Sequence, residues 1–151
     1  MSEKLLVASA AEMIDLGERL AENFVAGDLV VLDGPVGAGK TTLTKGIARG
    51  LGVVESVTSP TFVISRVHST VAGQPDLVHV DAYRLGSIVE VDSLDLETSL
   101  ADSVTVVEWG AGLIEGLTDE HWLIKIERDV IADSETRAIE IFPPANRELN
   151  L

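Results

Sequence analysis

Cysteine is absent from the chain, and basic side chains are scarce. The 151 residues contain no cysteine, so the fold does not depend on disulfides. No apolar run approaches the roughly 18 residues that a membrane-spanning helix needs, and the N-terminus lacks the features of a secretory signal. Eleven basic residues against 25 acidic ones give a net charge of −14, which as a whole repels a phosphate backbone. These absences argue against tight direct binding of nucleic acid and predict a soluble, cytoplasmic protein with no membrane partner.

Length and composition are those of one globular domain. Hydrophobic residues make up 46% of the chain and charged residues 24%, and a chain of this length buries a sizeable core. The sequence shows no repeat, low-complexity stretch or interdomain linker. We therefore interpret residues 1–151 as a single domain.

Hydrophobic patterning in the first third predicts a helix, a strand and a second helix. Ser9 and Glu12 stand at capping-box spacing before an amphipathic stretch that ends at Gly27. The apolar run at 29–32 has the length of a strand buried on both faces. Apolar side chains every four residues then predict a helix over 40–51.

The rest of the chain is expected to form mainly strands. Short helices are predicted within the acidic stretch 86–103. The alternating segments 122–127 and 137–142 predict an antiparallel hairpin with one solvated face, followed by a frayed tail. Further strands are predicted at 61–67, 77–80 and 104–108, the first two paired as a hairpin.

A phosphate-binding loop is predicted between the first strand and the second helix. Residues 34–42, GPVGAGKTT, match the pattern G-x-x-x-x-G-K-[ST] in full and lie in the strand-to-helix context that it requires. Gly37, Ala38 and Gly39 would turn successive backbone N–H groups toward phosphate oxygens. A glycine-rich turn without a ligand is the structural alternative, and the full match in context favours a nucleotide site.

Three residues after the glycines supply the expected chemistry of this loop. Lys40, at an end of the loop expected to face solvent, brings a full positive charge near the β- and γ-phosphates and begins a helix whose N-terminus attracts anions. Thr41 offers a hydroxyl oxygen to Mg²⁺, and Thr42 a hydrogen bond to an α-phosphate. The stretch is therefore predicted to bind a nucleotide with magnesium.

The remaining sequence favours ATP over GTP and weakens the case for a kinase. It lacks the Asn-Lys-x-Asp stretch with which GTPases recognise guanine, and it has neither an arginine-rich lid nor a separate acceptor domain. Glu108 ends an apolar strand, where P-loop enzymes carry a second metal-side carboxylate, and a solvated glutamate at a strand end is its alternative. Asp81 follows another strand and has a turn-capping aspartate as its alternative. His79 is interpreted as structural, and residues 58–62 either as a switch segment or as a plain proline turn.

Four separated motifs in this order resemble the TsaE family, the ATPases of bacterial tRNA threonylcarbamoyladenosine biosynthesis: GPVGAGKTTLTKGIARGLG, VTSPTF, HVDAYRL and VVEWG. The resemblance covers nearly the whole chain. It implies an α/β, P-loop NTPase-like fold with a mostly parallel central sheet flanked by helices and an antiparallel C-terminal hairpin. It also implies weak ATP hydrolysis with ATP/ADP and Mg²⁺, and assembly with the TsaD and TsaB proteins, which would hold the tRNA.

The resemblance also implies roles for individual residues, with one departure. Many relatives have aspartate where this chain has Pro35, whose missing N–H puts the outer contacts of the loop in doubt but not its lysine and threonine chemistry. Candidate catalytic residues are Lys40, Asp81 and Glu108; candidate metal ligands are Thr41 and Glu108; the nucleotide pocket would add Ser9 and Arg137 to the loop.

Two other functions are compatible with the same loop. A small-molecule kinase would phosphorylate a metabolite, and a binding module would hold a nucleotide without turning it over. The leading interpretation is a weak ATPase that acts as a nucleotide-dependent partner of a tRNA-modifying complex.

Overall fold

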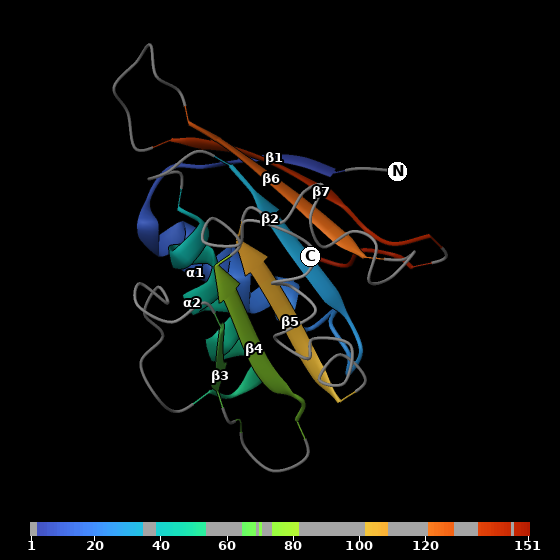
Figure 1. Cartoon of the computed structure of the whole chain (residues 1–151). Helices are drawn as coiled ribbons and strands as arrows, with labels where there is room; N and C mark the ends of the chain where they lie inside the picture. The colour runs from blue at the N-terminus through green and yellow to red at the C-terminus, as the bar shows by residue number, and fades with distance from the viewer. Residues whose placement is uncertain are drawn as a thin grey trace.

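The computed structural model describes residues 3–34, 39–53, 65–68, 70, 74–81, 102–108, 121–128, 136–145 and 147–151. No helix in these ranges is long and apolar enough to cross a bilayer. Figure 1 shows the elements, which are β1 (Glu3–Val7), α1 (Ala10–Ala21), β2 (Leu29–Asp33), α2 (Lys40–Leu51), β3 (Ser65–His68), β4 (Asp76–Asp81), β5 (Ser103–Glu108), β6 (Trp122–Arg128) and β7 (Arg137–Phe142).

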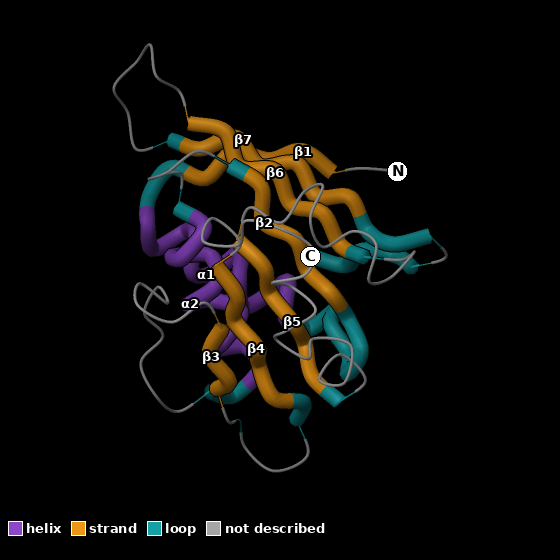
Figure 2. Tube along the Cα trace, viewed as in Figure 1, coloured by secondary structure: helices purple, strands orange, loops and turns teal. Residues whose placement is uncertain are grey.

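The described strands, orange in Figure 2, form one sheet in the order β1-β7-β6-β2-β5-β4-β3. The four central strands β6, β2, β5 and β4 run parallel, whereas β7, β1 and β3 pair antiparallel with their neighbours (Figure 1). The predicted parallel centre, the hairpin of β3 with β4 and the C-terminal hairpin of β6 with β7 are thereby confirmed. Strand β1 was not predicted, because at this edge of the sheet only its last residue, Val7, is buried.

Strands β2 and β5 run through the middle of the sheet and are buried on both faces. Residues 29–32 are completely buried, and every residue of β5 is buried as well. Continuous burial explains why neither segment shows the alternation of charged and apolar residues seen in β6. The main core lies between the helices and the face of the sheet that carries Val30, Val104 and Val106.

Helix α1 begins as predicted but ends well before Gly27. The Ser9 hydroxyl accepts a hydrogen bond from the Glu12 N–H at 3.2 Å, and the Glu12 carboxylate accepts one from the Ala8 N–H at 2.6 Å. The capping box is therefore present, with its return bond shifted by one residue. After Ala21 the chain enters a turn in which Asp28 Oδ2 accepts from the Val25 N–H at 2.8 Å, so the residues before Gly27 are not helical.

The two helices cross at glycines. A Cβ on Gly17 of α1 would lie 2.6 Å from the Leu43 carbonyl oxygen and 2.7 Å from Gly46 Cα. A Cβ on Gly46 of α2 would in turn overlap the backbone of Ile14. The missing side chains allow one backbone to rest on the other, and this contact fixes α2 relative to α1.

The C-terminal tail is docked rather than frayed. The Arg147 guanidinium donates to both carboxylate oxygens of Asp28, at 2.9 and 3.2 Å, and to the Asn23 carbonyl at 2.8 Å. The Asn150 N–H donates to the Asn23 side chain at 2.9 Å, and Leu149 packs against the core. The prediction of a frayed tail was wrong because these partners lie far away in sequence.

We expect Gly46→Ala to lower the free energy of unfolding by about 1–3 kcal/mol, the usual cost of overpacking. The clash with Ile14 must outweigh the higher helix propensity of alanine. Urea unfolding measures the change, and Lys45→Ala, at an exposed position on the same helix, is the control with little expected effect. Equal stabilities of the Gly46 variant and the unsubstituted protein would contradict the close crossing.

Candidate nucleotide-binding site

The carboxyl ends of three parallel strands meet at one edge of the sheet. In β5, Glu108 is level with Leu32 of β2 on one side and with Asp81 of β4 on the other. The chain leaves β2 at this edge and enters α2 at Lys40. This register brings the start of α2 and the carboxyl ends of β2, β5 and β4 together, at the usual place for ligands in an open α/β sheet.

The N-cap of α2 is a glycine and makes no side-chain hydrogen bond to the helix. This residue, Gly39, adopts φ = 106°, a left-handed conformation that glycine takes readily, and the first turn of α2 carries no acidic residue. Helix α1, by contrast, is capped by Ser9. The partial positive charge at the start of α2 therefore favours an anion.

Lys40 points back toward the end of β2 and is not solvent-facing as its sequence position suggested. Only 7% of its surface is exposed, and its ammonium donates a hydrogen bond to the Gly34 carbonyl. The side chain therefore links the first residue of α2 to the residue that follows β2. Gly37 and Ala38, two of the predicted cofactor-binding residues, fall outside the described residues.

Thr41 and Glu108, the two predicted metal ligands, are in direct contact. The Thr41 hydroxyl donates to Glu108 Oε1 at 2.6 Å, although the two residues lie 67 positions apart. A hydroxyl and a carboxylate are hard oxygen donors of the kind that Mg²⁺ prefers. In the described part of the chain, no group of three or more His, Cys, Asp or Glu could hold a metal. The pair fits an ion bound through one or two protein oxygens together with phosphates and water.

Glu108 is a buried acid surrounded by groups that favour its ionised form. Burial by itself raises the pKa of Glu108, but the His79 ring, the Thr41 hydroxyl and the Lys40 ammonium outweigh it and hold the pKa below the ordinary glutamate value. The side chain is therefore a carboxylate at neutral pH. His79, Thr41 and Lys40 all stabilise this negative charge.

His79 is the residue that sequence reasoning undervalued. It is completely buried, and its Nε2 lies 3.3 Å from Glu108 Oε2. Its position in a strand of alternating pattern gave no reason to separate it from a core histidine. No local pattern could have identified this contact. His79 and Glu108 share a face of the sheet because β4 and β5 pair in parallel in this register.

The other candidates lie at or near the same edge, without a described contact to the loop. Ser9 caps α1, Thr42 is half-buried in the first turn of α2, and the backbone of Asp81 is level with Glu108. Arg137 starts β7, paired with Val7, and donates to its neighbouring Thr136 carbonyl at 3.2 Å. Because β7 begins where the parallel strand β6 ends, Arg137 also belongs to the carboxyl edge. The switch candidate at 58–62 lies outside the described residues.

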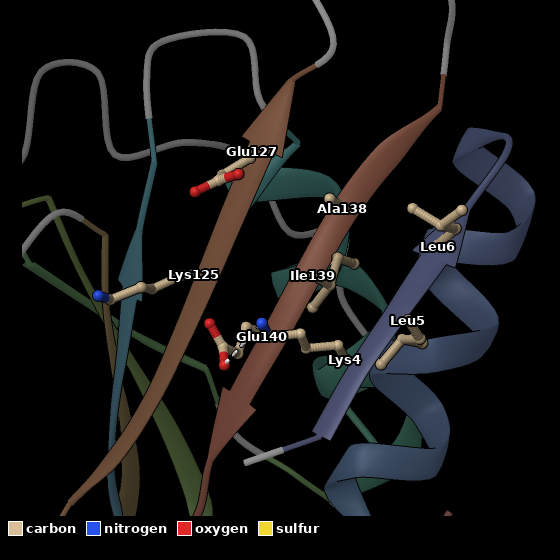
Figure 3. Close-up of a pocket in the computed structure, with 8 residues that line it drawn as sticks. All are labelled: Lys4, Leu5, Leu6, Lys125, Glu127, Ala138, Ile139 and Glu140. Carbon is tan, nitrogen blue, oxygen red and sulfur yellow. Dashed lines mark ion pairs between the residues drawn. The ribbon is translucent and has the colours of Figure 1, made fainter.

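A separate hollow of about 360 Å³ lies over strands β1, β7 and β6 (Figure 3). None of the residues lining it belongs to the candidate site. An ion pair between Lys4 and Glu140, 4.0 Å apart, crosses it. Among the residues around it are Lys4, Leu6, Lys125, Glu127, Ala138 and Glu140.

Comparison with known proteins gives consistent matches. A family model described as threonylcarbamoyl adenosine biosynthesis protein TsaE matches residues 7–139. The tRNA threonylcarbamoyladenosine biosynthesis protein TsaE of Streptomyces coelicolor is 58% identical over 119 residues, which cover 78% of this chain and 80% of that protein. The protein of the same name from Mycobacterium tuberculosis is 50% identical over 133 residues, covering 83% of this chain and 78% of its own.

A solved structure matches as well. The crystal structure of YdiB from Bacillus subtilis superposes with a TM-score of 0.77 at 31% identity, over 97% of this chain and 88% of that one. Together with the sheet order, this match confirms the predicted fold class.

We expect Thr41→Val to lower the free energy of unfolding by about 1–3 kcal/mol, because a buried carboxylate loses a hydrogen-bond donor. Thr42→Val makes the same change one residue later in the same helical turn and is the matched control. Thermal or urea unfolding without nucleotide measures both. If the two variants lose the same free energy of unfolding, the loss comes from placing valine in the helix. It then does not come from the hydrogen bond to Glu108.

Proposed function

Because the chain belongs to the TsaE family of tRNA threonylcarbamoyladenosine biosynthesis proteins, we propose that it is the ATP-hydrolysing component of that modification. It binds ATP, hydrolyses it slowly and acts through nucleotide-dependent assembly with the TsaD and TsaB proteins. The modified base is the adenosine beside the anticodon, and the chain reaches tRNA only through its partners.

The observation that supports this proposal most directly is the 2.6 Å contact between Thr41 and Glu108. It joins the first turn of the helix after the phosphate loop to the end of the neighbouring strand. ATP-hydrolysing P-loop proteins use this pairing of a hydroxyl with an acidic side chain, because the two residues would hold the metal ion that neutralises phosphate charge. A loop that served only as a turn would have no use for it.

Each residue has a role in the proposed reaction. The N–H groups at the start of α2 bind phosphate oxygens, and the Lys40 ammonium exchanges the Gly34 carbonyl for a phosphate oxygen. Thr41 and Glu108 would hold Mg²⁺, which neutralises charge that develops between the β- and γ-phosphates. Asp81, level with Glu108 at the end of β4, is assigned to orient the attacking water.

The net charge of the chain supports coupling to a partner protein. With a net charge of −14, the surface does not favour binding of a polyanion such as tRNA. ATP hydrolysis by this chain would therefore act on a partner protein, and that partner would bind the tRNA. ATP and ADP would then stabilise different surfaces of the chain, and a partner that prefers one of them would bind in a nucleotide-dependent way.

Lys40→Ala should reduce ATP hydrolysis by about 100-fold or more, because it removes the positive charge at the transferring phosphate. Phosphate release measures the rate, and Lys45→Ala, which removes an exposed lysine from the same helix, should keep the normal rate. Thermal unfolding checks that the Lys40 variant is folded. Unchanged hydrolysis in the Lys40 variant would refute the site.

The same assay separates the alternatives. Phosphate transfer to a member of a metabolite panel in place of water would identify a kinase. A nucleotide that stays bound and unhydrolysed, whether or not TsaD and TsaB are present, would identify a binding module.

Affinity for a TsaD–TsaB complex should differ about tenfold or more between the state loaded with a non-hydrolysable ATP analogue and the ADP state. A factor of ten corresponds to about 1.4 kcal/mol of coupling, and linkage requires the partners to change the relative affinities for the two nucleotides by the same factor. Surface plasmon resonance with immobilised TsaD–TsaB measures it. Absence of binding in both nucleotide states would contradict the proposed partner. Identical affinities in the two states would contradict nucleotide-dependent assembly.

A further inference from the structure

Both oxygens of the Glu108 carboxylate have a neighbour. Thr41 donates to Oε1 at 2.6 Å from the side of α2, and the Nε2 atom of His79 lies 3.3 Å from Oε2 on the side of β4. The side chains of His79 and Glu108 are 0% and 6% exposed. Two elements therefore enclose one carboxylate, and rotation of that carboxylate would break one contact or the other.

A purely structural role does not account for an imidazole at this position. His79 follows the buried Leu77 on the face of β4 that packs on the core, level with Val106 of β5. Apart from the 3.3 Å approach of Nε2 to Glu108, neither ring nitrogen has a polar partner within the described residues. Burying a polar ring in this way costs stability, and an aliphatic side chain would fit the apolar surroundings better.

We propose that His79 is a positioning residue, which holds the Glu108 carboxylate in the orientation that presents Oε1 to Thr41 and to the bound metal. The inference rests on the proposed ATPase function and extends it to a residue outside the loop and the strand end. His79 touches neither nucleotide nor metal in this role. It acts through Glu108, as outer partners of metal-binding carboxylates do.

The chain offers graded substitutions and a matched control. His79→Leu removes the polar ring and keeps the bulk, whereas His79→Gln keeps an N–H at the same number of bonds from the backbone as Nε2. His79→Asn keeps an N–H that ends too close to the backbone to reach Glu108. Thr105→Val is the control, because Thr105 is also completely buried in this sheet and its hydroxyl has no hydrogen-bond partner in the described part of the chain.

The experiment compares the affinity for a non-hydrolysable ATP analogue in magnesium and in EDTA by isothermal titration calorimetry. The ratio of the two dissociation constants is the gain due to magnesium. We expect His79→Leu and His79→Asn to lose about tenfold or more of that gain, with the affinity in EDTA unchanged. His79→Gln should retain most of the gain, and Thr105→Val should retain all of it.

Thermal unfolding without nucleotide completes the comparison. A positioning role predicts that His79→Leu melts no lower than the unsubstituted protein, and if this variant does not fold, the contrast between Gln and Asn decides the question. If His79→Leu or His79→Asn keeps the full gain in affinity due to magnesium, the inference about His79 is wrong and the proposed function still stands. Equal affinities in magnesium and EDTA for the unsubstituted protein would overturn the proposed function and this inference with it.

Discussion

The parallel pairing of β2 with β5 places Glu108, the central carboxylate of the candidate site, beside the end of the strand that leads into the phosphate loop. Four consecutive pairs, from Leu29 with Thr105 to Leu32 with Glu108, set the height at which the acidic strand end meets the start of the loop. Because side chains alternate across a strand, a shift of one residue would turn Glu108 to the other face of the sheet. Such a shift is opposed because it would turn Thr105 toward the core in place of Val104 and Val106.

A second constraint holds α2 over that edge. The contact of Gly17 with Gly46 lets the two helices approach backbone to backbone, so the first turn of α2 has little freedom to move away from Glu108. The site combines this rigid frame with three buried polar groups, Lys40, His79 and Glu108. One carboxylate beside an ammonium and an imidazole is a tolerable arrangement in a protein interior, whereas each group alone would be costly to bury.

Sequence reasoning located the elements with strong local signals. The apolar runs of β2 and β5, the four-residue repeat of α2 and the capping box at Ser9 each depend on residues close together in the chain. What it missed depends on distant contacts. The end of α1 is set by the turn at Asp28, the tail is held by that same Asp28, and β1 becomes a strand by pairing with β7.

The same distinction applies to the candidate site. Lys40, Thr41 and Glu108 were identified because a motif and a strand end mark them, and the structure brings all three together. The burial of Lys40 and Glu108 was not foreseen, and neither was the contact of His79 with Glu108. That contact follows from the register of β4 with β5, which local periodicity does not determine. Ser9 and Arg137 were suggested only by resemblance, and their role remains a prediction.

The docked C-terminal tail also affects the tryptophan fluorescence of the protein. Trp122 is completely buried, its ring meets Phe24 edge-on at 5.1 Å, and the Arg147 guanidinium lies 5.7 Å from its centre. The chain has one other tryptophan, Trp109, next to Glu108 in sequence. With phenylalanine at that second position, the only indole left is that of Trp122, which contacts Phe24 and, in the tail, Arg147. The wavelength and intensity of Trp122 emission would then report detachment of the C-terminal tail separately from nucleotide binding at the phosphate loop.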